Sequence, residues 1–147
     1  MKPTIFILVV FISLGCLNNK KEFKDVMTKN DSIFVIIDTI GFEYPEVIKA
    51  QVILETGNFS SRVYKQNNNL FGMRLPKSRL TKATSSNYGY AVYPDVFSSI
   101  EDRLIYDTLY FKNLNRQQYL NKLNRIYAAN PNYIQHLEKI IQKNFAD

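Results

Sequence analysis

Tryptophan is absent from this 147-residue sequence, and cysteine and histidine occur once each, as Cys16 and His136. A single cysteine excludes an intramolecular disulfide. A single histidine without neighbouring cysteines or paired carboxylates provides neither a typical metal-ligand set nor a Ser-His-Asp triad. The sequence also lacks a glycine-rich phosphate-binding loop and an internal repeat. We therefore expect no metal and no other cofactor.

The composition is that of a single globular domain with a basic surface. A chain of 147 residues with 46% hydrophobic residues is long enough for one domain and short for two. Ten tyrosines and ten phenylalanines make it rich in aromatic residues. The formal charge of +6 suits an anionic partner such as nucleic acid, an anionic membrane or a bacterial cell wall. Charge alone is equally consistent with a role in solubility.

The N-terminus resembles a bacterial lipoprotein signal. Lys2 precedes an apolar run over residues 5–12, which is shorter than the roughly 20 residues of a membrane-spanning helix. Ser13-Leu14-Gly15-Cys16 follows and resembles a lipobox, although Ser13 stands where leucine is more usual. We predict a signal peptide over 1–15, lipidation of Cys16, a lipid-anchored linker over 16–31, and a cell-envelope location facing the periplasm or on the outer membrane. A plain signal or an uncleaved anchor remains the alternative.

The domain over 32–147 is expected to be mostly helical. Residues 32–41 are β-branched and fit either a strand or a short helix. Pro45 and Gly57 bracket a periodic apolar segment that predicts a largely buried helix over 45–56. Residues 79–93 have the pattern of a β-hairpin.

Three capping patterns predict the remaining helices. Ser99 with Asp102, then Asn115, then Asn130 before Pro131, each stand at the start of a helical apolar pattern. The expected fold class is mostly α (α+β), with a helical body and a small β-hairpin lobe.

Glu55 is the residue most suggestive of chemistry. It lies in the last turn of an apolar helix, where the negative end of the helix and burial both disfavour a charged carboxylate. Both effects raise the pKa of the carboxyl group, and a proton-holding acid is what a glycosidic oxygen needs in order to leave. A glutamate that merely points into water at a helix end is the alternative. The following Asn67-Asn68-Asn69 can bind sugar hydroxyl groups or satisfy its own turn.

Several ordered motifs resemble the glucosaminidase-domain family of bacterial peptidoglycan hydrolases (glycoside hydrolase family 73). They are Ala50-Gln51-Val52-Ile53-Leu54-Glu55-Thr56-Gly57, Asn68-Asn69-Leu70-Phe71-Gly72-Met73, Tyr90-Ala91-Val92-Tyr93 with Ser99-Ile100-Glu101-Asp102, and Tyr127-Ala128-Ala129-Asn130-Pro131-Asn132-Tyr133-Ile134. The resemblance implies a lysozyme-like fold with a sugar groove. It also implies cleavage of the β-1,4 bond after N-acetylglucosamine in peptidoglycan, without nucleic acid as a partner.

The same resemblance implies roles for individual residues. Glu55 is the expected catalytic acid, and Tyr127 is expected to orient an acetamido group or a water molecule. Phe71 is expected to stack against a sugar face. The expected substrate-binding residues are Gln51, Asn68, Asn69, Phe71, Tyr90 and Tyr93.

The sequence departs from the family at the second carboxylate, because residues 77–94 contain no acid. The nearest candidates are Asp95, which we keep as a candidate catalytic residue, and Asp102, which the pattern favours as a helix cap. Retaining, inverting and substrate-assisted routes therefore stay open. The missing carboxylate also leaves an alternative function, a wall-binding or scaffold protein that has lost turnover.

Overall fold

The computed structural model describes residues 30–127 and 130–145, so the predicted signal peptide and Cys16 lie outside the described residues. The described part has six helices and one two-stranded sheet. None of its helices combines the length and hydropathy needed to span a bilayer. The helical elements are α2 (Asn30–Thr39), α3 (Pro45–Glu55), α4 (Arg62–Asn67), α5 (Val96–Tyr110), α6 (Arg116–Ile126) and α7 (Tyr133–Asn144), and the strands are β1 (Ser85–Asn87) and β2 (Tyr90–Val92).

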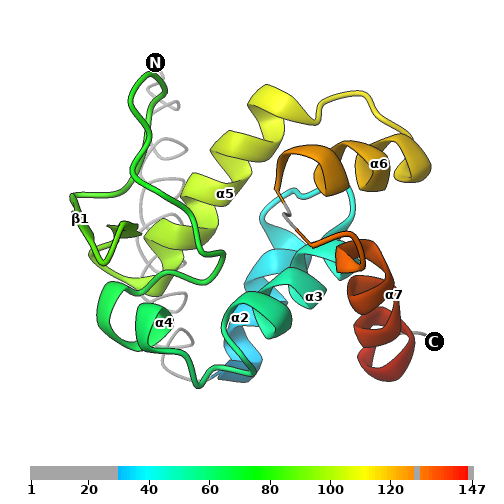
Figure 1. Cartoon of the computed structure of the whole chain (residues 1–147), viewed down its shortest axis with the longest axis horizontal. Coiled ribbons are helices and arrows are strands. Elements are labelled where there is room, and N and C mark those ends of the chain that lie inside the picture. The colour runs from blue at the N-terminus through cyan, green and yellow to red at the C-terminus, as the bar shows by residue number, and fades with distance from the viewer. Residues whose placement is uncertain (1–29, 128–129, 146–147) are drawn as a thin grey trace, which may run out of the picture.

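This arrangement confirms the mostly α, lysozyme-like fold class. In Figure 1, α4 and the hairpin form a small lobe on one side, α6 and α7 lie on the other, and α2 and α3 lie between them. The long helix α5 runs beside this centre, from the lobe towards the loop that leads to α6.

The ambiguous segment after residue 31 is helical. Ile33, Ile36 and Ile37 are spaced three and one apart, so a helix places them on one face, and all three are buried. A strand would have divided them between two faces. Helical spacing therefore prevails over the β propensity of the individual residues.

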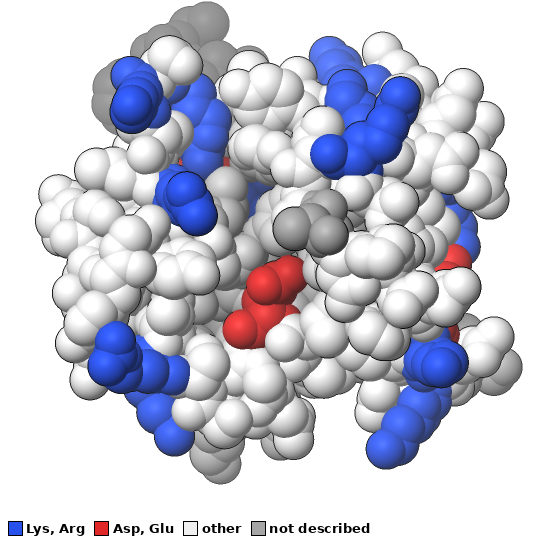
Figure 2. All heavy atoms as spheres, in the orientation of Figure 1, with Lys and Arg blue, Asp and Glu red and all other residues white. Residues whose placement is uncertain are grey.

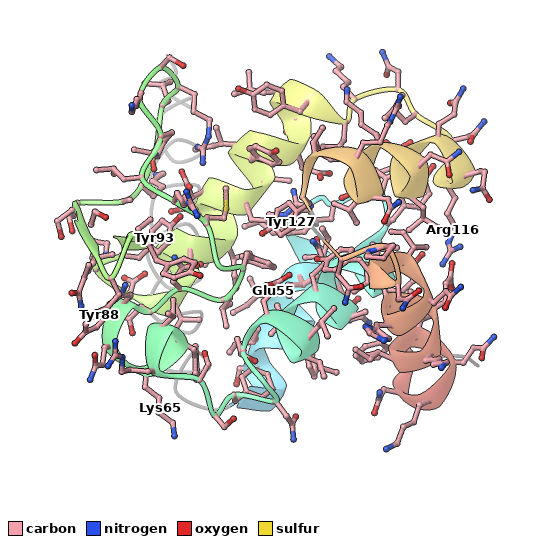
Figure 3. The ribbon with its side chains drawn as sticks, viewed as in Figure 1. Glu55, Lys65, Tyr88, Tyr93, Arg116 and Tyr127 are labelled. Atoms are coloured by element: carbon pink, nitrogen blue, oxygen red, sulfur yellow. The ribbon has the colours of Figure 1, made fainter. Side chains whose placement is uncertain are left out.

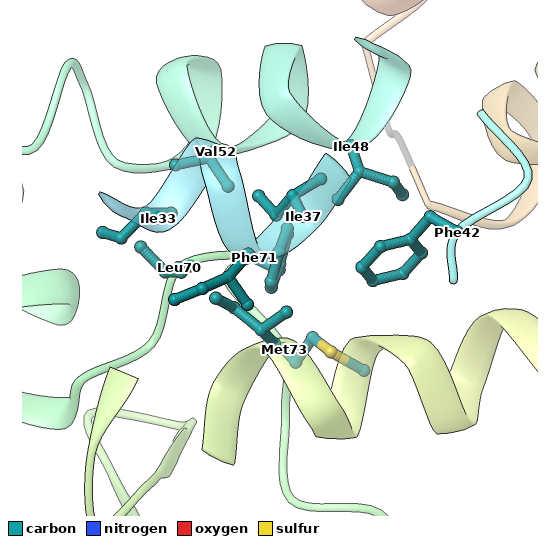
Figure 4. Packing of buried hydrophobic residues seen from close by; sticks show 10 residues of the cluster. Ile33, Ile37, Phe42, Ile48, Val52, Leu70, Phe71 and Met73 are labelled. Atoms are coloured by element: carbon teal, nitrogen blue, oxygen red, sulfur yellow. The ribbon is translucent and has the colours of Figure 1, made fainter. Parts of the chain in front are cut away.

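Helix α3 lies between two hydrophobic clusters and contributes to both. It has Pro45 in its first turn and is followed by Gly57 with a φ of +55°, as predicted. Ile48 and Val52 pack with α2 and with the segment at Phe71, which Figure 4 shows between α2, α3 and α5. The second cluster, to which α3 contributes its other face, consists of Val47, Ala50, Phe111, Tyr119, Leu120, Leu123, Tyr133, Leu137 and Ile141. Each fully buried aliphatic side chain stabilises the fold by about 1.5–3 kcal/mol, so the last turn of α3 has a firm support.

The hairpin is shorter than predicted and is closed by a tight turn. Tyr88 and Gly89 form the two-residue connection with φ values of +54° and +78°, the pattern that matches strand twist in such turns. Ser86 pairs with Ala91 at the centre of the antiparallel ladder. A two-stranded sheet of this size is not stable alone, so its attachment to the body determines whether it forms.

Helix starts differ from the predicted caps in two places. Helix α5 begins one turn early because Asp95, not Ser99 with Asp102, accepts the capping hydrogen bond, from the backbone N–H of Ser98. Helix α7 begins at Tyr133, after Asn132. Asn115 caps α6 as predicted.

Candidate active site

Glu55 is the last residue of α3 and is half-buried. Figure 2 shows an acidic side chain on the floor of a hollow near the centre of one face, at the place where Figure 3 labels Glu55. Most of the lysine and arginine side chains in this view lie around the margins of the face. The carboxyl group is therefore open to a ligand but surrounded mainly by uncharged atoms.

Each carboxyl oxygen of Glu55 has a different neighbour. The hydroxyl group of Tyr133, at the start of α7, donates a hydrogen bond of 2.9 Å to Oε1. Oε2 faces Gly72, where an added Cβ would lie only 3.3 Å from it and 4.0 Å from the ring of Tyr90. Gly72 has a φ of +62°, so both its conformation and its missing side chain matter here.

The surroundings of Glu55 favour its protonated form. Burial raises the pKa of Glu55, and the hydrogen bond from Tyr133 opposes the rise without cancelling it. Burial and the nearby Glu55 carboxyl group also raise the pKa of Tyr133, which therefore remains a neutral donor. The pair suits an acid that keeps its proton until a basic atom approaches.

Tyr127 lies beside this pair, directly after α6. Its hydroxyl group donates a hydrogen bond to the backbone carbonyl of Phe71. Its ring lies 6.3 Å from that of Tyr133 at an angle of 28°, a stacked arrangement. Burial raises the pKa of Tyr127 as well, so its hydroxyl group stays protonated. The structure thus brings Tyr127 and Glu55 together, while its catalytic role stays a prediction.

A pocket of about 370 Å³ lies next to the Glu55 site, and Gly72 and Tyr127 belong both to its lining and to the surroundings of Glu55. Aromatic faces and guanidinium groups bind sugar rings and their substituents well. The remaining lining residues are Met73, Arg74, Pro76, Ser78, Arg79, Tyr106, Tyr110 and Ile126.

Behind Tyr133 lies a buried polar cluster in which Gln51 is joined by Arg103 and Asp107, two residues that no sequence motif indicated. Gln51 donates to the Tyr133 hydroxyl oxygen and accepts from Arg103, which is fully buried. Arg103 is paired with Asp107, one helical turn further along α5. The opposite charges four residues apart were a possible signal, but such pairs are ordinary on helix surfaces.

Residues 41–146 match the family model described as "Glucosaminidase: Mannosyl-glycoprotein endo-beta-N-acetylglucosaminidase". The chain belongs to the glucosaminidase family. A search of curated proteins and a search of solved structures each give no match. The matched range contains Glu55, Tyr127 and Tyr133, so the family that the motifs indicated is confirmed for the part that carries the site.

The structure buries four of the predicted sugar contacts of this glucosaminidase domain. Phe71 is fully buried in the core below the site and has no exposed face for a sugar. Gln51 is equally buried, and its amide group is engaged by Tyr133 and Arg103. Tyr93 is buried and donates its hydroxyl group to Asp102. Asn69 is the fourth, because it is buried and bonded to backbone. Tyr90 is half-buried beside Gly72, and its role in substrate binding stays a prediction.

The three asparagines fasten the hairpin of this glucosaminidase domain to the end of α4 and the loop that follows it. Asn67 donates to the carbonyl of Asn87 in the hairpin, and Asn68 donates to the carbonyl of Tyr93. The amide nitrogen of Asn69 bonds the carbonyls of Met73 and Ala91, both at 2.9 Å. The turn-satisfying alternative is therefore what the structure contains, and we call Asn67–Asn69 the asparagine latch.

Neither candidate for a second carboxylate lies free beside Glu55. Asp95 is exposed and accepts from the backbone N–H and hydroxyl group of Ser98, so it caps α5, and its catalytic role stays a prediction. Asp102 is fully buried and binds both terminal nitrogens of Arg79. The prediction that Asp102 caps the helix was wrong, because it lies inside α5.

Proposed function

We propose that the protein cleaves the β-1,4 bond after N-acetylglucosamine in peptidoglycan glycan strands, with Glu55 as the general acid. The observation that carries this proposal is the half-buried Glu55 carboxyl group with raised pKa on the floor of an open hollow. Membership of the glucosaminidase family supports a glycosidase activity in general. The bond, the polymer and the role of Glu55 are the parts we propose.

In this mechanism, Oε2 of Glu55 gives its proton to the glycosidic oxygen as the bond to the anomeric carbon breaks. The positive charge that develops on the sugar then needs a partner. Asp102 is committed to Arg79, and Asp95 caps a helix, so we favour assistance by the acetamido oxygen of the substrate itself. Tyr127, within the site, is the residue proposed to orient that acetamido group.

The activity is expected to decline at alkaline pH. A general acid works only while protonated, so kcat/KM falls as the pH rises through the pKa of Glu55 in the free enzyme. Because burial raises this pKa, the decline lies at higher pH than it would for an exposed glutamate.

The deciding experiment compares wild type with Glu55→Gln on purified peptidoglycan, measured as release of reducing ends. We expect roughly a 10²- to 10⁴-fold loss in kcat, because the amide cannot donate an acidic proton. Glu43→Gln, an exposed change of the same chemistry, serves as the control. Equal rates for wild type and Glu55→Gln reject the role of Glu55.

An additional variant separates the routes. If the acetamido group is the nucleophile, Asp95→Asn keeps most of the activity and most of its stability, because asparagine caps a helix about as well as aspartate. A loss as large as that of Glu55→Gln in a folded Asp95→Asn protein would instead identify Asp95 as the second carboxylate.

A second candidate function is wall binding without turnover, which the absence of acids over 77–94 motivates. A pull-down with glycan strands and a turnover assay on the same preparation distinguish the two functions. Binding without cleavage supports the scaffold, and cleavage rejects it.

We further propose that Cys16 is acylated and anchors the domain in the cell envelope through the linker that follows it. Mass spectrometry of the mature N-terminus tests this anchor. An unmodified chain that begins elsewhere than Cys16 would rule it out.

A further inference from the structure

A continuous chain of hydrogen bonds connects a buried cation to the proposed catalytic acid. Arg103 donates from Nη2 to Oε1 of Gln51 at 3.0 Å. Gln51 donates from Nε2 to the Tyr133 hydroxyl oxygen at 2.8 Å, and that hydroxyl group donates to Oε1 of Glu55 at 2.9 Å. The chain therefore passes from α5 through α3 to α7 and returns to the end of α3.

The direction of every bond in this chain is fixed by Arg103. A guanidinium group can only donate, so it must take the oxygen of the Gln51 amide group. The amide NH₂ group of Gln51 therefore faces Tyr133 and donates a hydrogen bond to its hydroxyl oxygen. The hydroxyl hydrogen of Tyr133 then has Glu55 as its acceptor.

Arg103 is itself held in place. Its Nη1 donates to Asp107 at 2.8 Å, and its Nη2 donates a further hydrogen bond to the Tyr119 hydroxyl oxygen at 3.1 Å. Tyr119 in turn donates to Asp107 at 2.6 Å. Arg103, Gln51 and Tyr133 are all buried, so water has little access to scramble these bonds.

We propose that Gln51 is a positioning residue which, with Arg103 behind it, fixes the direction of the Tyr133 hydrogen bond and thereby places the catalytic proton of Glu55 on Oε2. Oε1 is occupied as an acceptor, whereas Oε2 faces the space that Gly72 leaves open. Gln51 acts from behind the site and touches no sugar. This inference rests on the proposed role of Glu55 as the acid.

The groups that influence the titration of Glu55 come from several elements. Tyr133 of α7 bonds it directly, and Tyr127 after α6 lies close enough for the two groups to affect each other's pKa. Tyr90 of β2 lies beside Gly72. The charged group of the hydrogen-bond chain is Arg103, and Asp107 balances its charge. Tyr133 is therefore the group through which Gln51 affects Glu55.

The variant Gln51→Glu tests this inference with almost no change in volume. Beside Arg103 the new carboxyl group is ionised, and it accepts from Tyr133 instead of donating to it. Glu55 then loses its donor and gains a negative neighbour, so its pKa rises by about one unit or more. We expect the alkaline limb of the kcat/KM profile to move upward by the same amount, and kcat on its plateau to fall roughly tenfold at unchanged KM.

The measurements are kinetics on purified peptidoglycan and a ¹³C NMR titration of the Glu55 carboxyl group. Gln142→Glu, the same change on an exposed position of α7, is the matched control and is expected to leave both unchanged. Tyr133→Phe is the second variant, because it removes only the hydroxyl group and leaves Gln51 bonded to Arg103. It is expected to raise the pKa of Glu55 in the same direction.

An unchanged pKa of Glu55 in a folded Gln51→Glu protein would overturn the inference. A raised KM with unchanged kcat would also overturn it, because it would mean that Gln51 contacts the glycan. If Gln51→Glu does not fold, an unchanged Glu55 pKa in Tyr133→Phe overturns it instead. A wild-type protein that releases no reducing ends would reject the proposed function alone. The NMR titration would then still decide whether the hydrogen-bond chain controls Glu55.

Discussion

Replacement of Asp102 by asparagine provides a stringent test of how the lobe is attached to the helical body. Asp102 is fully buried in α5 and accepts hydrogen bonds from Nη1 and Nη2 of Arg79 at 2.9 and 2.8 Å. It also accepts from the Tyr93 hydroxyl group at 2.8 Å and the backbone N–H of Lys82 at 3.0 Å. One carboxylate therefore holds the pocket wall at Arg79, the segment at Lys82 and the residue after the hairpin.

In Asp102→Asn the volume stays constant, but the charge and one acceptor oxygen are lost. In either orientation the new NH₂ group faces a donor of Arg79, together with the backbone N–H of Lys82 at one position or the Tyr93 hydroxyl group at the other. Removing one partner of a buried ion pair costs about 3–5 kcal/mol. Arg79 lines the pocket and can turn towards water, so we expect the lower end, about 3 kcal/mol, which corresponds to a decrease in Tm on the order of 10 °C.

The assay is denaturant unfolding of wild type and Asp102→Asn, repeated from neutral to acidic pH. Burial alone would raise the pKa of Asp102, but the hydrogen bonds from Arg79 and Tyr93 outweigh it and lower the pKa below its usual value. A lowered folded-state pKa contributes stability above the unfolded-state pKa, which for Asp is about 3.9, and this contribution is lost as the pH falls through the folded-state value. The difference between the two proteins is therefore expected to be constant near neutrality and to shrink below about pH 4.

Glu101→Gln is the matched control, because Glu101 precedes Asp102 on α5 and pairs with Lys82 of the same segment at 3.3 Å. That pair is largely exposed, so its loss is expected to cost less than 1 kcal/mol. If Asp102→Asn is no more destabilising than Glu101→Gln at pH 7, or if its effect persists unchanged in acid, the reasoning fails.

Two further substitutions address the loop that faces Glu55. In Gly72→Ala, a methyl group 3.3 Å from Oε2 of Glu55 and a φ of +62° are expected to lower kcat about tenfold and stability by about 1 kcal/mol. Gly89→Ala shares the positive φ in open space, so equal kcat losses in the two variants would contradict a specific effect. Asn69→Ala leaves buried backbone groups without partners and is expected to cost about 2–4 kcal/mol in denaturant unfolding. A cost no larger than that of the exposed Asn121→Ala would show that the latch is unimportant.

The types of most elements and the position of the acid were predictable because they depend on local patterns, whereas residues 32–41 fitted either a strand or a helix and α4 was not predicted. Pro45, the apolar spacing behind it and Gly57 define α3, which places Glu55 at a helix end. Family motifs then indicated Tyr127, and the structure places it near Glu55. Capping was harder to predict, since both Asp95 with Ser98 and Ser99 with Asp102 have suitable spacing, and only the packing of α5 shows which pair lies at its start.

Residue roles that depend on tertiary contacts were not predictable. The sequence does not show on which side of its loop the Phe71 side chain lies. In the structure it packs into the hydrophobic core. The asparagine latch has the composition of a sugar-binding loop, because an asparagine amide group can form hydrogen bonds with backbone carbonyls as well as with sugar hydroxyl groups. Arg103 and Asp107 have the spacing of a surface pair, and their burial appears only once α3, α6 and α7 are packed around them.

The asparagine latch has a consequence for the entropy cost of binding a polymer in the hollow. Hydrogen bonds from Asn67 to the hairpin, and from Asn69 to Met73 and Ala91, set the spacing of the wall opposite Glu55 before anything binds. A wall whose hydrogen bonds are already made needs little reordering when a ligand binds, so most of the entropy cost of arranging it belongs to folding rather than to binding.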